Sequence, residues 1–203
     1  MNAHRTQVVL FDLGGVLFHI GHVGAFGEMI GETDDGEVLR RWVTCPWVQR
    51  YDRGQCSRQD FAVGIVEHHG IALTPDKFLN HFTTWVPGPQ DGAADLLRET
   101  KASGMRTACL SNTNEAHWSA DNGLAAFVEQ FDHRFLSFEI GHVKPDLSSF
   151  THVAAELGCY AGEVLFLDDV QVNVDTACSL GFDAMLAKGI AMARSILHKR
   201  AII

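Results

Sequence analysis

Four short apolar runs, separated by helical patterns, constrain the fold most strongly. The runs are rich in Val, Leu, Ile or Phe and lack the alternation of a sheet with one wet face, so we expect buried parallel strands at residues 8–11, 107–110, 163–167 and 183–187. Helical patterns that end in glycine cover residues 91–104, 146–158 and 172–181. This alternation predicts an α/β fold with a doubly wound parallel sheet and right-handed crossovers. In the helix expected at 91–104, we predict Asp91 as the N-cap and Ala94, Leu96 and Leu97 on the buried face.

Residues 21–85 interrupt this alternation. They contain helical patterns and no convincing strand, and we expect helices at 23–30, 35–50, 58–69 and 75–84. The predicted organisation is an α/β core domain at 1–20 and 86–203 with a helical cap domain at 21–85. An insert directly after the first strand lies above the carboxyl ends of the strands, where open α/β sheets bind ligands.

Composition narrows the class of protein. The chain has 203 residues, 46% of them hydrophobic and 20% charged, as globular domains do. A net charge of -9 without a basic run argues against nucleic acid or an anionic membrane as a partner. The cysteines, five in number and without a CxxC pair, argue against a disulfide framework and for a reducing, cytoplasmic location.

No apolar stretch is long enough to span a bilayer, and the first strand begins before there is room for a secretory leader. The last segment, 190–203, fits either a packed terminal helix or a contact surface, which leaves a monomer or a homodimer open.

Polar residues follow the predicted strands at the point where each one ends. They are Asp12 after the first strand, Ser111 and Asn112 after the second, and Asp168 and Asp169 after the third. Lys144 lies in the loop "GHVKPD", where Pro145 keeps the preceding residue extended. Because the carboxyl ends of parallel strands meet at one edge, we expect these side chains to converge there.

Each residue also has a purely structural interpretation. Ser111, Asn112 or Thr113 can cap the next helix, and Gly14 and Gly15 can form a tight turn. Lys144 alone is typical of a solvated surface charge. Two adjacent acids at a crowded strand end, however, repel each other unless a cation relieves them. The combination therefore favours a functional site.

These groups suit phosphoryl transfer with an aspartate as nucleophile. Mg²⁺ prefers oxygen ligands, and the chain offers carboxylates together with a backbone carbonyl near Gly14. We expect the metal ligands to be Asp12, Gly14, Asp168 and Asp169. Ser111 and Asn112 are expected to bind the substrate, and Lys144 to neutralise charge that develops during transfer.

The motifs "FDLGGVL", "CLSNTN", "GHVKPD" and "FLDDVQVN", in this order, resemble the haloacid dehalogenase superfamily over nearly the whole chain. The resemblance is to the branch with a helical cap after the first strand, most closely to small sugar-phosphatase-like members. It implies that Asp12 is the nucleophile, that Ser111 binds phosphate, that Lys144 stabilises the site and that Asp168 and Asp169 bind or position Mg²⁺. It also implies that the cap closes over a small phosphorylated metabolite, such as a sugar phosphate.

One position departs from the family pattern. The usual phosphatase has a second aspartate two residues after the nucleophile, acting as general acid and base, and here that residue is Gly14. General acid–base help is typically worth about 10²- to 10⁴-fold. A cap residue or a water can take its place, and His19 and His22 lie nearby in the sequence. No histidine pair shows a third donor at zinc-ligand spacing, so none is assigned to a metal.

Two other functions stay open. A dehalogenase of the same superfamily, in which the aspartate attacks carbon without a metal, also lacks the second aspartate, but it has no use for the acid pair Asp168-Asp169. A noncatalytic phosphate-binding relative is also consistent with Gly14, whereas a signal-receiver domain is disfavoured because its acid pair follows the first strand.

Overall fold

The sheet is built from five parallel strands in the order β3-β2-β1-β4-β5. A computed structural model describes residues 5–203, apart from the side chains of His22 and Val23. The strands are β1 (Val8–Phe11), β2 (Arg106–Ser111), β3 (His133–Leu136), β4 (Val164–Asp168) and β5 (Asp183–Leu186). The central β1 pairs with β2 on one side and with β4 on the other. The predicted doubly wound parallel α/β fold is confirmed.

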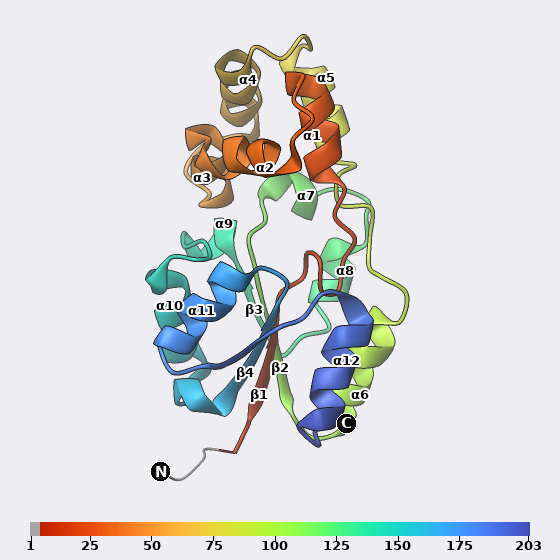
Figure 1. Cartoon of the computed structure of the whole chain (residues 1–203), viewed down its shortest axis with the longest axis vertical. Coiled ribbons are helices and arrows are strands. Elements are labelled where there is room, and N and C mark those ends of the chain that lie inside the picture. The colour runs from red at the N-terminus through yellow and green to blue at the C-terminus, as the bar shows by residue number, and fades with distance from the viewer. Residues whose placement is uncertain (1–4) are drawn as a thin grey trace.

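Helices cover both faces of the sheet (Figure 1). Val9 and Phe11 of β1 join the apolar cluster that includes residues of α6 (Ala93–Ala102) and α12 (Gly189–Lys199). Val8 and Leu10 point the other way and join the cluster of α10 (Leu147–Leu157) and α11 (Gln171–Ser179). Because successive strand side chains point to opposite faces, an all-apolar strand has to be covered on both.

The segment between β1 and α6 is helical and gathers at the top of the molecule in Figure 1. It contains α1 (His22–Ile30), α2 (Asp35–Thr44), α3 (Pro46–Asp52), α4 (Arg58–His69) and α5 (Pro75–Phe82). These helices enclose an apolar cluster rich in aromatic rings, among them Phe26, Phe61, Phe78, Phe82 and Trp85. The division into a core domain and a cap domain stays a prediction, although this separate cluster supports it.

Short elements complete the chain around the sheet. They are α7 (Glu115–Trp118), α8 (Leu124–Val128), α9 (Ser137–Ile140) and the 3₁₀ turn η1 (Ala161–Glu163). One of them, α7, meets the helical segment: the Tyr51 hydroxyl donates to Glu115 Oε2 at 3.1 Å and accepts from the backbone N–H of Ala116 at 2.9 Å. These contacts tie α3 to α7 above the sheet.

Strand β3 was not predicted from the sequence. This strand lies at the edge of the sheet, and only Phe135 and Leu136 of its four residues are buried. His133 and Arg134 give it no apolar run, so the pattern of a buried strand is absent from the sequence.

Two helix boundaries were also predicted wrongly. The expected helix at 35–50 divides at Cys45, because Pro46 follows and the residue before a proline is driven to an extended conformation, here with ψ 122°. The expected N-cap Asp91 is not the cap. Gly92, with φ +84°, occupies that position, and this shifts the buried face to Ala93 and leaves Ala94 exposed.

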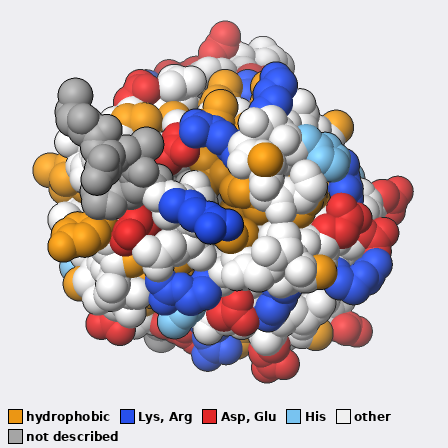
Figure 2. Space-filling model, turned by 90° about the horizontal axis from the view of Figure 1, so that it is seen from below, with side chains coloured by type: hydrophobic (Ala, Val, Ile, Leu, Met, Phe, Trp, Pro, Cys, Tyr) orange, Lys and Arg blue, Asp and Glu red, His pale blue; other side chains and the backbone are white. Residues whose placement is uncertain are grey.

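The terminal helix α12 buries Ala193, Ile196 and Leu197, which favours the packed-helix interpretation of the last segment. The face of the molecule opposite the helical segment carries interspersed acidic and basic side chains (Figure 2). Within residues 5–203, no helix combines the length and the apolar character needed to cross a membrane.

Candidate active site

The polar residues at the ends of three adjacent strands lie together. Asp12 directly follows β1, Ser111 is the last residue of β2 and Asp168 is the last residue of β4. The register places Phe11 opposite both Cys109 and Leu167, so these strand ends are level with one another. The carboxylates of Asp12, Asp168 and Asp169 approach one another, each with an oxygen within 4.8 Å of the other two.

Lys144 joins two of these carboxylates. Its Nζ lies 2.7 Å from Asp12 Oδ1 and 2.7 Å from Asp168 Oδ2. The lysine side chain is 2% exposed and that of Asp168 is fully buried. The surface-charge interpretation of Lys144 is therefore wrong, because this lysine is a buried counterion.

The pKa values show how crowded the acids are. Burial raises the pKa of Asp12 to about 8, against the opposing effect of Lys144, and Asp168 raises it further. Burial and then Asp168 also raise the pKa of Asp169. Burial alone would lower the pKa of Lys144, but Asp12 and Asp168 outweigh it and raise that pKa. A further cation beside these acids would favour their ionised forms.

Two amide side chains hold the charged groups in place. Asn173, on α11, donates from Nδ2 to both oxygens of Asp168 at 3.0 and 3.1 Å, and the Val170 N–H donates to Asp168 Oδ1 at 2.8 Å. Asn112 donates to the Lys144 carbonyl at 2.8 Å and accepts from the Lys144 N–H at 2.8 Å. The role of Asn112 in substrate binding stays a prediction, and its amide also fixes the backbone of Lys144. Asn173 was not predicted, although it lies in the quoted motif "FLDDVQVN".

The capping interpretation of the residues after β2 is wrong. The N-cap of α7 is Asn114, whose side chain accepts from the His117 N–H at 3.1 Å. Ser111 and Asn112 are thus free of that role, and both line a cavity above the strand ends.

The glycine turn after Asp12 is shaped by the acids. Gly15 has φ +70°, and a Cβ on it would lie 2.1 Å from Asp169 Oδ2, so this position requires glycine. A Cβ on Gly14 would lie 2.5 Å from Cδ1 of Ile20, a side chain that is 43% exposed. Gly14 therefore tolerates a side chain only if Ile20 moves.

A cavity of about 110 Å³ separates the strand ends from the helical segment. Residues of both parts line it, including Gly14, Ser111, Asn112, Asn114 and His117 from below and Trp42, Asp52, Phe82 and Trp85 from above. Of the histidines proposed from the sequence, His19 is exposed and the His22 side chain lies outside the described residues.

Asp52 is the acidic residue of the helical segment that reaches this cavity. Its Oδ1 accepts a hydrogen bond from Asn114 Nδ2 at 3.1 Å. Burial raises the pKa of Asp52 to about 7, against the effect of Asn114. No pattern in the sequence singles out Asp52, which lies between the predicted helices at 35–50 and 58–69.

The carboxylates of Asp12, Asp168 and Asp169 fit a hard divalent cation. All three offer oxygen donors, which Mg²⁺ prefers. The contacts to Asp12 from Lys144 and from the Leu13 N–H both engage Oδ1. Among the contacts of the described residues none engages Oδ2, which leaves that oxygen for a metal or for phosphorus.

Comparison with known proteins agrees with this geometry. The chain matches the haloacid dehalogenase-like hydrolase family over residues 6–181. It is 26% identical to sesquiterpene phosphatase astK of Aspergillus oryzae over 175 residues, 86% of each chain. It is 24% identical to D-ribitol-5-phosphate phosphatase of Bacteroides thetaiotaomicron over 187 residues, 86% of this chain and 88% of that one. Two other relatives are much longer proteins, and the matched region spans 17% of one and 34% of the other.

Solved structures share the fold. The HAD family enzyme bt-2542 of Bacteroides thetaiotaomicron, in complex with magnesium and inorganic phosphate, superposes with a TM-score of 0.69 at 22% identity, covering 89% of this chain and 93% of that one. Two L-2-haloacid dehalogenases share the fold as well, with TM-scores of 0.62 and 0.59. With the motifs in order and the acids grouped at the strand ends, the chain belongs to the haloacid dehalogenase-like hydrolase family.

Proposed function

We propose that this hydrolase is a Mg²⁺-dependent phosphatase that acts through an aspartyl-phosphate on a small phosphorylated metabolite. The observation that carries the proposal is the grouping of Asp12, Asp168 and Asp169 around a buried lysine. A phosphoester is anionic, and a carboxylate nucleophile approaches it only where cations offset the repulsion.

In this proposal, Asp12 Oδ2 attacks phosphorus while the ester P–O bond breaks, and the leaving oxygen takes up a proton. A water then attacks the phosphorus of the aspartyl-phosphate, which releases inorganic phosphate and restores Asp12. Asp12, the Gly14 carbonyl, Asp168 and Asp169 would hold Mg²⁺, which supplies charge neutralisation when bound. Lys144 keeps Asp12 in place and offsets developing charge, Ser111 binds phosphoryl oxygens, and Asn112 positions Lys144.

The cavity and the relatives support a proposal for the substrate class. Its volume of about 110 Å³ suits a small group, and its lining combines polar side chains with the rings of Trp42, Phe82 and Trp85. Two relatives are named sesquiterpene phosphatase and D-ribitol-5-phosphate phosphatase. We propose a small phosphomonoester, such as a sugar phosphate, as the substrate.

We propose that Asp52 acts as the general acid and base in place of the aspartate that the family usually has at position 14. It faces the same cavity as Gly14 and Ser111, and Asn114 orients its carboxyl group. A pKa of about 7 allows it to hold a proton for the leaving group and to accept one from water near neutral pH. The helical segment would thus supply both the cover of the site and its proton shuttle.

A dehalogenase is the second candidate, because Gly14 fits it equally well. Displacement of halide leaves an ester that water hydrolyses without a metal, so such a site gains nothing from grouping Asp168 and Asp169 beside Asp12. The grouping favours the phosphatase.

One panel distinguishes the two candidates. Sugar and nucleotide monophosphates and p-nitrophenyl phosphate are assayed for phosphate release with Mg²⁺ and with EDTA, and 2-haloacids are assayed for halide release. The proposal predicts phosphate release that requires Mg²⁺. Halide release that survives EDTA would establish the dehalogenase, and no turnover of any ester would support a nonhydrolysing phosphate binder.

Asp52→Asn tests the proton shuttle, because the amide oxygen can still accept the hydrogen bond from Asn114. Turnover of an alkyl phosphate is expected to fall by about 10²- to 10⁴-fold. Turnover of p-nitrophenyl phosphate, whose leaving group needs little protonation, is expected to fall far less. The matched control is Asp76→Asn, an exposed acid on α5. Equal losses on both substrates would remove Asp52 from the reaction.

A further inference from the structure

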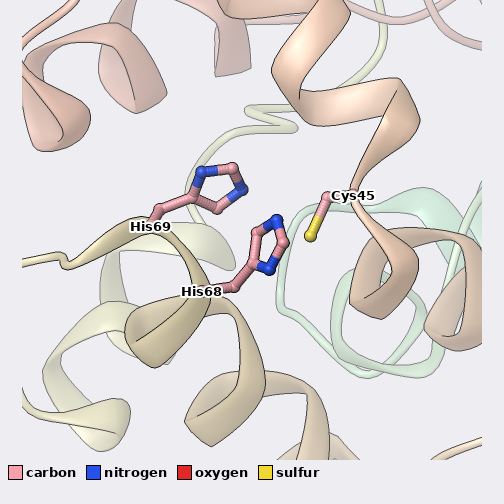
Figure 3. Close-up of side chains that lie close together, drawn as sticks. All are labelled: Cys45, His68 and His69. Carbon is pink, nitrogen blue, oxygen red and sulfur yellow. The ribbon is translucent and has the colours of Figure 1, made fainter.

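A second group of metal-ligand side chains lies inside the helical segment, apart from the carboxylates. Cys45 sits at the junction of α2 and α3, and His68 and His69 are the last two residues of α4. Figure 3 shows the Cys45 sulfur directed toward the His68 ring, with the His69 ring beside it. Ligand atoms of the three residues all lie within 4.8 Å of one another.

The surroundings of His69 suit a metal ligand. Its Nε2 is buried and has no hydrogen-bond partner among the residues that the structure describes. A buried polar atom without a partner carries a free-energy cost. Nothing in the packing of its ring, which meets Phe26 edge-on at 5.1 Å, relieves that cost.

The charges around the group also suit a metal. The positive charge of Arg41 is offset by Glu37 at 3.0 Å and by Glu32 at 3.9 Å. Cys45 is a free thiol and is 1% exposed.

We propose that Cys45, His68 and His69 bind a Zn²⁺-class transition-metal ion. One thiolate and two imidazoles are the borderline and soft donors that this class selects, whereas Mg²⁺ prefers oxygen. Binding releases the thiol proton of Cys45 to solvent and forms one metal–sulfur and two metal–nitrogen bonds, with a water completing the tetrahedron. Metal–ligand bonds in such a site are about 2.0–2.3 Å long.

The site has an entry path and a structural consequence. His68 is exposed, so an ion reaches the buried thiol from the surface. Bound metal would join the α2–α3 junction to the end of α4. His69 packs on Phe26, and Phe26 packs at 5.0 Å on Trp42, which lines the substrate cavity. The ion would therefore stiffen the helices that roof that cavity.

Cobalt(II) is the probe, because a cobalt–thiolate bond absorbs in the near ultraviolet and a carboxylate site does not. Full-length protein is stripped with EDTA, dialysed, supplied with excess Mg²⁺ to occupy the carboxylates, and titrated with Co²⁺. One equivalent of Co²⁺ is expected to give the thiolate charge-transfer band. Added Zn²⁺ is expected to displace the Co²⁺, to remove the band and to raise the melting temperature of the protein.

Three variants decide the outcome. Cys45→Ser should abolish the band, and His68→Gln, at an exposed position, should weaken Co²⁺ binding by more than about tenfold. Cys178→Ser, which removes an exposed cysteine elsewhere, should leave the titration unchanged. Absence of the band in the wild type, or its persistence in Cys45→Ser, would overturn the site whatever the chain hydrolyses.

Discussion

Replacing Lys144 by methionine tests the electrostatic arrangement at the strand ends. Lys144 is the shared counterion of Asp12 and Asp168, at 2.7 Å from each, and the side chains of this trio are at most 10% exposed. Removing one member of a buried ion pair leaves an uncompensated charge and typically costs about 3–5 kcal/mol of unfolding free energy. Asp168 keeps its bonds from Asn173 and the Val170 N–H, so Asp12 is the carboxylate that loses its counterion and is held in its protonated form.

Lys101 provides the matched control. It also lies 2.7 Å from a carboxylate, that of Asp132, but the two side chains are 39% and 36% exposed. Exposed pairs typically contribute about 0–1 kcal/mol. Lys144→Met and Lys101→Met thus remove ion pairs of the same length that differ in burial.

Urea unfolding in EDTA, followed by circular dichroism, measures both variants. We expect Lys144→Met to lose about 3–5 kcal/mol and Lys101→Met to lose less than about 1 kcal/mol. Because a divalent cation can replace part of the lost charge, Mg²⁺ should restore stability to Lys144→Met without restoring turnover. Equal losses in the two variants would refute the reasoning.

Three further predictions concern the turn after Asp12 and the proposed proton shuttle. In Asp52→Asn protein, Gly14→Asp should recover alkyl-phosphate turnover by at least about tenfold once Ile20 moves aside; phosphate-release assays without any gain would contradict this. Gly15→Ala should weaken Mg²⁺ binding in calorimetry, because its Cβ would meet Asp169 Oδ2 at 2.1 Å, and an unchanged affinity would oppose the predicted role of Asp169. The pKa of Asp52 is about 7 in the folded protein and 3.8 in the unfolded chain, so between these pH values only the folded protein keeps the proton. The free energy of unfolding therefore falls as the pH rises from about 4 to 7. Asp52→Asn should flatten that fall by at most about 1.4 kcal/mol per pH unit in urea titrations, and parallel curves would contradict the raised pKa.

The sheet and the grouping of acids were predictable for one physical reason. A strand buried on both faces must be apolar throughout, so Val8–Phe11 stands out in the sequence, and parallel topology then carries Asp12 and Asp168 to one edge. The edge strand β3 lacks that burial and was missed.

The contacts between the helical segment and the strand ends were not predictable in the same way. Asp52 and Cys45 acquire their surroundings from helix packing, which no periodicity in the sequence reports. Helix α3 and most of α4 separate Cys45 from His68 in the sequence. Only the three-dimensional structure shows that the Cys45 sulfur lies beside the two histidines.

The nucleophilic role of Asp12 is the claim on which the rest depends. Asp12→Asn keeps the size of the side chain and removes the charge, and circular dichroism checks that the variant is folded. Phosphate release is then measured for both proteins at saturating Mg²⁺ on the best ester of the panel. The proposal predicts that the variant falls to the uncatalysed rate, whereas turnover within about tenfold of the wild type would contradict attack by this carboxylate.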